Sequence, residues 1–259
     1  MRKMEIWEVP VVVTTIVVLA VLLLPVLVRS RESCRCHVSC QNNLKQMGLI
    51  LKMYAIESKG MYPPVSPVPG NWMASMTAVY PEYMTNPDIL TCPDSPLKHQ
   101  GAFTLRGNIE HPGATIGAFH PDCVTALFYL YTGYELMRDE QARALVEARN
   151  ALPESWFGTA DIEVHATRGA GGAIPEMVRK LKDAVLSNLS RVPILWDRIG
   201  TAKGDSNHTP AGSNVLYADG HTEFKKCRDH NKPDDFPVTR LVAEVFGNSV
   251  PRLSRDCQE

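Results

Sequence analysis

The stretch that decides the predicted fold is Val9–Val28, VPVVVTTIVVLAVLLLPVLV, a run of 20 residues without a charged side chain. At about 1.5 Å rise per residue, a helix of this length spans about 30 Å, the thickness of a membrane's hydrocarbon core. A cleaved signal peptide would have a shorter apolar core and then a small-residue cleavage site, whereas the charged run RSRE (29–32) follows here. The sequence therefore predicts a retained transmembrane helix over 9–28, preceded by a short cytoplasmic N-terminus over 1–8.

A helical pattern continues beyond the apolar run. Apolar positions recur every three or four residues, which places them on one helix face, and Lys45 and Lys52 mark a wet face beside it. Gly60 stops the helix near Ser58. We therefore expect a helix kinked at Pro25, whose amphipathic continuation over 29–59 packs on a globular domain over 60–259. The apolar face consists of Leu44, Met47, Leu51 and Tyr54.

The sharpest local signal in the predicted globular domain is NVLYADGHTEFKK (214–226). Two alternating apolar runs flank Asp219 and Gly220, and an Asp-Gly pair between strands predicts a tight turn in which both residues have positive φ. The run 192–196 is typical of a buried strand, and helices are predicted at 139–150 and from Pro175. The fold class is therefore α+β, with a long N-terminal helix packed on an antiparallel β-sheet.

Composition narrows the functional classes. The net charge is −1, without the basic excess that a nucleic-acid partner needs. No motif of a nucleophile elbow, zinc protease, phosphate loop or dinucleotide fingerprint is present, so we expect no enzyme. All 7 cysteines follow the apolar run, which predicts disulfides if that side of the chain is oxidising. Their odd number leaves at least one thiol outside any intramolecular pair.

Four parts of the chain share a resemblance. They are LLLPVLVRSRE (22–32), CQNNLKQMGLILKMYAIESKGMYPP (40–64), YPEYMTNPDILTCPD (80–94), and VPILWDRIG (192–200) with HTPAGSNVLYADGHTEF (208–224). Together they resemble the bacterial type IV pilin-like, or pseudopilin-like, family, which has a prepilin-type N-terminus and a C-terminal H-X9-DG signature. The signature residues would be His208, Asp219 and Gly220, although ten residues rather than nine separate the histidine from the aspartate.

This resemblance implies a pilin-like fold, a single-pass location in the bacterial inner membrane, and an exported C-terminal domain. Aligned on Pro25, Glu8 takes the fifth position of the family's mature segment, where a carboxylate pairs with the N-terminal amine of a neighbouring subunit. The alternative is that Glu8 lies among lipid headgroups. Lys3 replaces the family's processing glycine, and Glu5 and Pro10 interrupt the apolar stretch, so processing does not follow from the resemblance.

Candidate metal ligands gather near the predicted hairpin. His208, Asp219 and His221, together with Asp205, could form a site of mixed nitrogen and oxygen ligands. Turn chemistry for Asp219 and solvent-exposed histidines are the alternatives. The resemblance adds calcium as a possible cofactor, with Asp205, Asp219 and Glu223 as oxygen ligands.

The resemblance also places Cys40 and Cys92 beside two of its motifs, which suggests a disulfide between them. The expected function is structural: a pseudopilin-like subunit anchored in the inner membrane that assembles into a secretion-type or surface filament. Its expected partners are membrane lipid and copies of itself or other pilin-like subunits. The alternative is a non-assembling, membrane-tethered binding domain of the same architecture, and a metal-dependent hydrolase rests only on the histidines near the hairpin.

Overall fold

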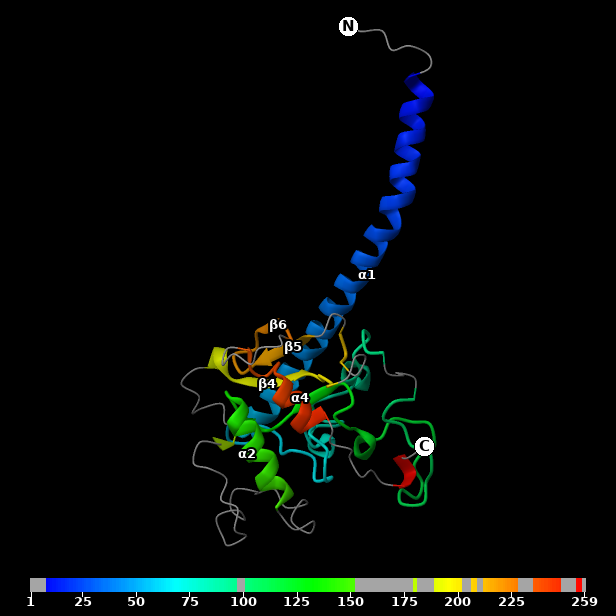
Figure 1. The fold of residues 1–259 in the computed structure, drawn as a ribbon. Helices are drawn as coiled ribbons and strands as arrows, with labels where there is room; N and C mark the ends of the chain where they lie inside the picture. Colours follow the sequence, from blue (N-terminus) through cyan, green and yellow to red (C-terminus); the bar gives the residue numbers. More distant parts are fainter. Residues whose placement is uncertain are drawn as a thin grey trace. The chain divides into compact units, whose positions relative to one another are not determined.

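The computed structural model describes residues 8–96, 101–151, 179–180, 189–201, 206–208, 212–227, 235–247 and 255–257. The chain divides into two compact units, Met1–Val38 and Ser39–Glu259. The boundary falls inside the first helix, α1 (Glu8–Glu57), so each unit contains part of it (Figure 1).

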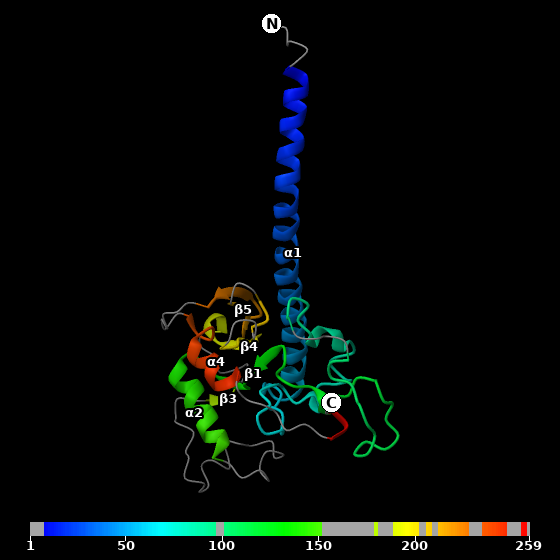
Figure 2. The same ribbon diagram turned by 45° about the vertical axis from the view of Figure 1, so that its right-hand side comes forward.

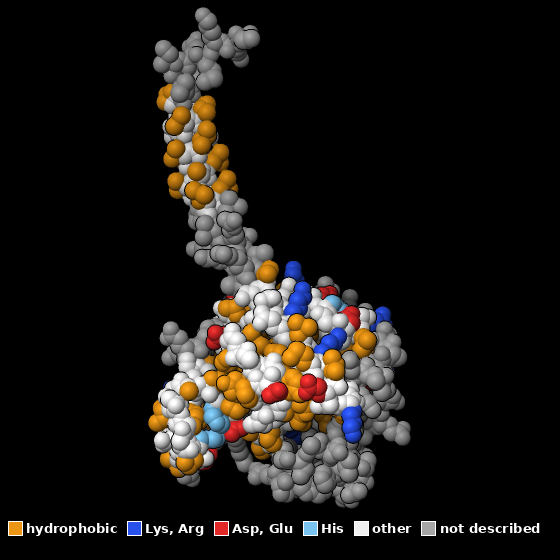
Figure 3. Space-filling model, turned by 180° about the vertical axis from the view of Figure 1, so that it is seen from behind, with side chains coloured by type: hydrophobic (Ala, Val, Ile, Leu, Met, Phe, Trp, Pro, Cys, Tyr) orange, Lys and Arg blue, Asp and Glu red, His pale blue; other side chains and the backbone are white. Residues whose placement is uncertain are grey.

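The first part of α1 has an apolar surface. The large side chains between Val11 and Leu24 are all at least half exposed, and Figure 3 shows them covering the visible face of this segment. The helix runs unbroken across Pro25. It ends at Glu57, where the amide of Gly60 donates to the carbonyl of Ala55 at 2.7 Å.

The transmembrane prediction needs correction. Among the residues that the structure describes, no helix combines the length and the apolarity required to cross a membrane. This finding contradicts the transmembrane helix predicted over 9–28. It also contradicts the transmembrane, pilin-like fold class and the single-pass inner-membrane location that were built on it.

The second unit is organised around a four-stranded antiparallel sheet in the order β1-β4-β5-β6. Successive pairs in this order are hydrogen-bonded, and β5 and β6 are consecutive in the chain while β1 joins the sheet from a distant segment. A separate two-stranded sheet pairs β2 with β3. The strands are β1 (Tyr129–Tyr131), β2 (Tyr134–Glu135), β3 (Arg179–Lys180), β4 (Pro193–Asp197), β5 (Gly212–Tyr217) and β6 (Thr222–Lys226).

Helices cover both faces of the sheet. Alternate side chains of a strand point to opposite faces, so Leu195 packs with the part of α1 that belongs to this unit, whereas Trp196 packs with α2 and α4 on the other face. Figure 2 shows the sheet between these helices. The helices of the second face are α2 (Asp139–Asn150) and α4 (Arg240–Gly247). Short 3-10 turns include η1 (Met76–Ala78), η2 (Pro87–Leu90), η3 (Pro121–Cys123), η5 (Leu189–Arg191) and η7 (Arg255–Cys257).

Two local predictions differ from the structure in detail. The loop between β5 and β6 contains four residues, Ala218–His221, rather than a two-residue Asp-Gly turn. Only Gly220 has positive φ, at 95°, while Asp219 accepts a hydrogen bond from the amide of His221 at 3.0 Å. The helix predicted from Pro175 lies mostly outside the described residues, and its described part is strand β3.

Candidate functional site

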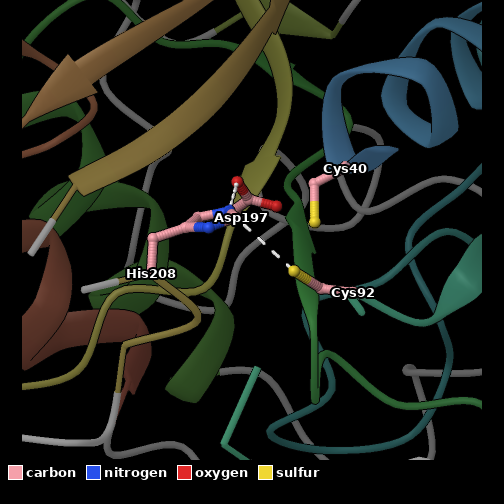
Figure 4. Close-up of side chains that lie close together, drawn as sticks. All are labelled: Cys40, Cys92, Asp197 and His208. Carbon is pink, nitrogen blue, oxygen red and sulfur yellow. Dashed lines mark hydrogen bonds and ion pairs between the residues drawn. The ribbon is translucent and has the colours of Figure 1, made fainter. Parts of the chain in front are cut away.

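Four side chains from separate parts of the second unit meet beside the sheet. Cys40 comes from α1, Cys92 follows η2, Asp197 ends β4, and His208 lies between β4 and β5. One ligand-type atom from each lies within 4.8 Å of the others. None of the four residues is more than 1% exposed. Figure 4 shows both sulfur atoms directed toward Asp197 and His208, and we call these residues the buried cluster.

His208 is held between two carboxylates. Its Nδ1 lies 2.6 Å from Oδ2 of Asp94, and its Nε2 lies 2.6 Å from Oδ2 of Asp197. Burial alone would lower the pKa of His208, but the hydrogen bond to Asp197, together with those to Cys40 and Asp94, outweighs it and raises the pKa to about 11. In the absence of any other ion, His208 is therefore a buried imidazolium that offsets the charge of Asp197.

Asp197 is a fully buried carboxylate at the end of an otherwise apolar strand. Its Oδ2 accepts from the amide of Asn214 at 2.8 Å and from the Asn214 side chain at 2.7 Å. Its Oδ1 has no hydrogen-bond partner within the described residues. A buried carboxylate oxygen without a partner costs free energy, so this oxygen is the least satisfied atom of the buried cluster.

The two thiols are not bonded to each other, so the predicted Cys40–Cys92 disulfide is absent from the structure. The Sγ of Cys92 lies 3.8 Å from Nε2 of His208. Hydrogen bonds from Cys92 and His208 lower the pKa of Cys40 to about 7, although burial opposes them. The same contact, with burial, raises the pKa of the Cys92 thiol. Cys40 is thus the first thiol to ionise, stabilised by its neighbours.

A second group of titratable side chains lies near the C-terminus. His111 contacts Asp122 through Nε2 and Asp256 through Nδ1, each at 3.1 Å. Asp256 also accepts from the backbone amides of Ile109, Glu110 and His111 at 2.7–3.0 Å. The disulfide Cys123–Cys257 joins the residues that directly follow Asp122 and Asp256 in the sequence. Together these bonds fasten the η7 segment to residues 107–123, and we call this arrangement the C-terminal clasp.

The C-terminal clasp is expected to be pH-dependent. Hydrogen bonds to Asp122 and, next, to Asp256 raise the pKa of His111 in the folded protein. The protonated ring therefore stabilises the fold fully below about pH 6.5, which is the pKa of histidine in an unfolded chain. This stabilisation is lost as the pH rises through the folded-state pKa. The melting temperature of His111→Gln should therefore fall furthest below wild type in mildly acidic buffer and approach it at alkaline pH. An equal difference at every pH would contradict this charge effect.

The predicted site residues are separated in the structure. Asp219 and His221 contact each other at 2.6 Å on the exposed β5–β6 loop, and Glu223 is exposed on β6. His208 is buried among different partners, and Asp205 lies outside the described residues. The groups of described residues that could hold a metal ion do not include Asp219, His221 or Glu223. Among the residues that the structure describes, the predicted ligands do not form an oxygen-rich calcium site.

Sequence reasoning missed Asp94 and Asp197. The signal for Asp197 was its place directly after the apolar run Val192–Trp196, since the structure extends the buried strand to include it. Asp94 lies two residues after Cys92, in the run Cys-Pro-Asp, but nothing local in the sequence links it to a histidine 114 residues away. The partnership of Asp197 with Asn214 depends on the pairing of β4 with β5.

Comparisons with models of protein families, with curated proteins and with solved structures gave no match.

Proposed function

We propose that this chain is a non-catalytic structural subunit that assembles with copies of itself through the first part of α1. The observation that carries the proposal is the exposure of a helix that is apolar on all sides. The exposed side chains are Val11, Val12, Val13, Ile16, Val17, Val18, Leu19, Val21, Leu22, Leu23 and Leu24, each 50–65% exposed. The proposal keeps the assembly part of the sequence-based expectation and drops its membrane anchor.

Such a surface favours contact with other helices. Fully burying one Val, Leu or Ile side chain stabilises by about 1.5–3 kcal/mol, so covering a stripe of several residues is strongly favourable. The segment's polar side chains do not oppose this, because the hydroxyl of Thr14 donates to Pro10 O at 2.6 Å and that of Thr15 to Val11 O at 2.8 Å. Since every side of the helix is apolar, one neighbour covers only part of it, which favours assemblies larger than dimers.

Copies of the same helix fit this surface best. The apolar segments have equal length in every copy and carry no charge that would repel a parallel neighbour. Glu8, where α1 begins, remains the predicted assembly carboxylate, although its side chain lies outside the described residues. In a bundle of parallel copies it would lie next to the N-terminal region of a neighbour, where a cationic partner could compensate its charge.

Catalysis is the competing function, because a cysteine, a histidine and an aspartate lie in contact in the buried cluster. The arrangement resembles a nucleophile with its base and orienting carboxylate. However, Cys40 and Cys92 are both 0% exposed, and His208 is 1% exposed. A substrate therefore has no route to either sulfur in this conformation, which favours a structural role for the cluster.

The test is crosslinking of the full-length chain through a photoreactive residue at position 16. We expect a ladder of self-crosslinked species for wild type and its loss for Leu22→Asp, because a carboxylate inside the apolar bundle lacks a partner. Glu8→Ala should weaken the ladder without abolishing folding. The matched control is Ile109→Asp, which places the same charge on a side chain that is 77% exposed in the second unit.

Two outcomes would overturn the proposal. One is a photoreactive residue that crosslinks only to lipid or detergent and never to a second chain. The other is an unchanged ladder in Leu22→Asp. Either would favour the non-assembling binding domain.

A further inference from the structure

We propose that the buried cluster is a zinc site in which Cys40, Cys92, Asp197 and His208 bind one Zn²⁺ ion. This site is independent of the proposed assembly, because all four ligands belong to the second unit. Two sulfur ligands, one imidazole nitrogen and one carboxylate oxygen form a set that zinc binds in proteins, whereas calcium and magnesium prefer oxygen ligands alone.

The separations of the ligand atoms fit a tetrahedral ion. With Zn–S of about 2.3 Å and Zn–N of about 2.0 Å, tetrahedral geometry sets the S–N separation at about 3.5 Å. The Sγ of Cys92 and Nε2 of His208 are 3.8 Å apart, and one atom from each of the four residues lies within 4.8 Å of the rest. Small side-chain adjustments therefore suffice to form the site.

The carboxylate of Asp197 has an oxygen left over for the ion. Its Oδ2 keeps the bonds from Asn214, while Oδ1 is completely buried and has no hydrogen-bond partner among the described residues. Figure 4 shows the oxygen that carries no dashed line on the side of Cys40. An ion bound at Oδ1 would satisfy this atom, which no described side chain does.

The surroundings of His208 complete a zinc-type arrangement. Ligating histidines usually donate the second ring N–H to a carboxylate, which fixes the tautomer and the ring orientation. Asp94 provides this acceptor at Nδ1, 2.6 Å away, and leaves Nε2 near Oδ2 of Asp197 at 2.6 Å and Sγ of Cys92 at 3.8 Å. On binding, both thiols and Nε2 release their protons to solvent, so the ion replaces the imidazolium as the counter-charge of Asp197.

The second candidate group, His111, His120 and Asp122, does not fit as well. His111 already contacts a carboxylate at each ring nitrogen, and the group contains no thiolate. Its residues are partly or fully exposed, so water competes for the same ligand atoms. The buried cluster, with four protein ligands and no solvent-exposed position, fits a structural zinc that ties α1 to β4, to the loop after η2 and to the segment between β4 and β5.

The experiment begins with the wild-type chain, fully reduced and metal-free, and needs no variant. Titration with Co²⁺ should give the visible bands of a tetrahedral ion and a thiolate-to-cobalt charge-transfer band, both abolished by about one equivalent of Zn²⁺. Chain purified without chelators should contain about one zinc by elemental analysis. No cobalt spectrum from the reduced chain would overturn the proposal, as would octahedral bands without charge transfer.

Variants then locate the ion. Cys92→Ser and His208→Gln should lose zinc at stoichiometric concentrations, whereas Cys227→Ser and His221→Gln, which change the same residue types elsewhere, should retain it. Asp94→Asn should keep one zinc with roughly 10–100-fold weaker affinity, because it alters only the partner of a ligand. Full zinc content in Cys92→Ser would refute the site. The site would also be refuted if protein isolated and mapped without reductant contained a Cys40–Cys92 disulfide and no bound metal.

Discussion

Alanine in place of His208 is expected to lower the free energy of unfolding of the reduced, metal-free chain by about 3–5 kcal/mol. The loss arises because Asp197 is 0% exposed and would lose the imidazole partner that now lies 2.6 Å away, with no water to replace it. Asn214 alone cannot compensate a buried carboxylate, since it donates to only one of the two oxygens. Denaturant unfolding in chelator measures this difference apart from any loss of metal.

His221→Ala is the matched control. His221 also contacts an aspartate at 2.6 Å, but the side chains of His221 and Asp219 are 44% and 34% exposed. Exposed ion pairs contribute about 0–1 kcal/mol, so this variant should remain close to wild type. Adding Asp197→Asn to His208→Ala should recover part of the lost stability, because the buried carboxyl group that lost its partner is gone. Equal effects of the two alanine variants would contradict the role given to burial.

Elements that depend on local sequence could be predicted. The strand predicted at 192–196 corresponds to β4 (Pro193–Asp197), and the helix predicted at 139–150 corresponds to α2 (Asp139–Asn150). In both, residues close in sequence determine the element through periodicity and end signals. The same reasoning gave the β5–β6 hairpin its place but not its four-residue loop, because the Asp-Gly pair fits more than one turn.

The candidate site could be predicted only in fragments. Cys40 and Cys92 were predicted to form a disulfide, and the structure places them close together as free thiols. Sequence does not reveal whether two close thiols form a disulfide or bind an ion. His208 was chosen for its place before the hairpin and was therefore grouped with Asp219 and His221. Its real partners come from the end of β4 and the loop after η2, which only the tertiary fold brings together.

The disulfide Cys123–Cys257 could not be deduced from the sequence, because seven cysteines allow many pairings and the sequence does not say which of them are close in space. Replacing both with serine is expected to lower the free energy of unfolding by about 2–5 kcal/mol. In the chain-entropy view the effect is at the upper end, because the bond closes a loop between residues 134 apart and restricts the unfolded chain. Denaturant unfolding of the double variant under non-reducing conditions measures it, with Cys227→Ser as the control.

The same variant should loosen the C-terminal clasp in a second, independent way. Asp256 is adjacent to Cys257 and contacts His111, so freeing the C-terminal segment weakens one of the two carboxylate contacts that raise the pKa of His111. An NMR titration should therefore show the His111 pKa moving toward 6.5, while the contact with Asp122 retains part of the shift. A variant as stable as wild type with an unchanged His111 titration would mean that the hydrogen bonds of Asp256 to residues 109–111 hold the segment without the disulfide.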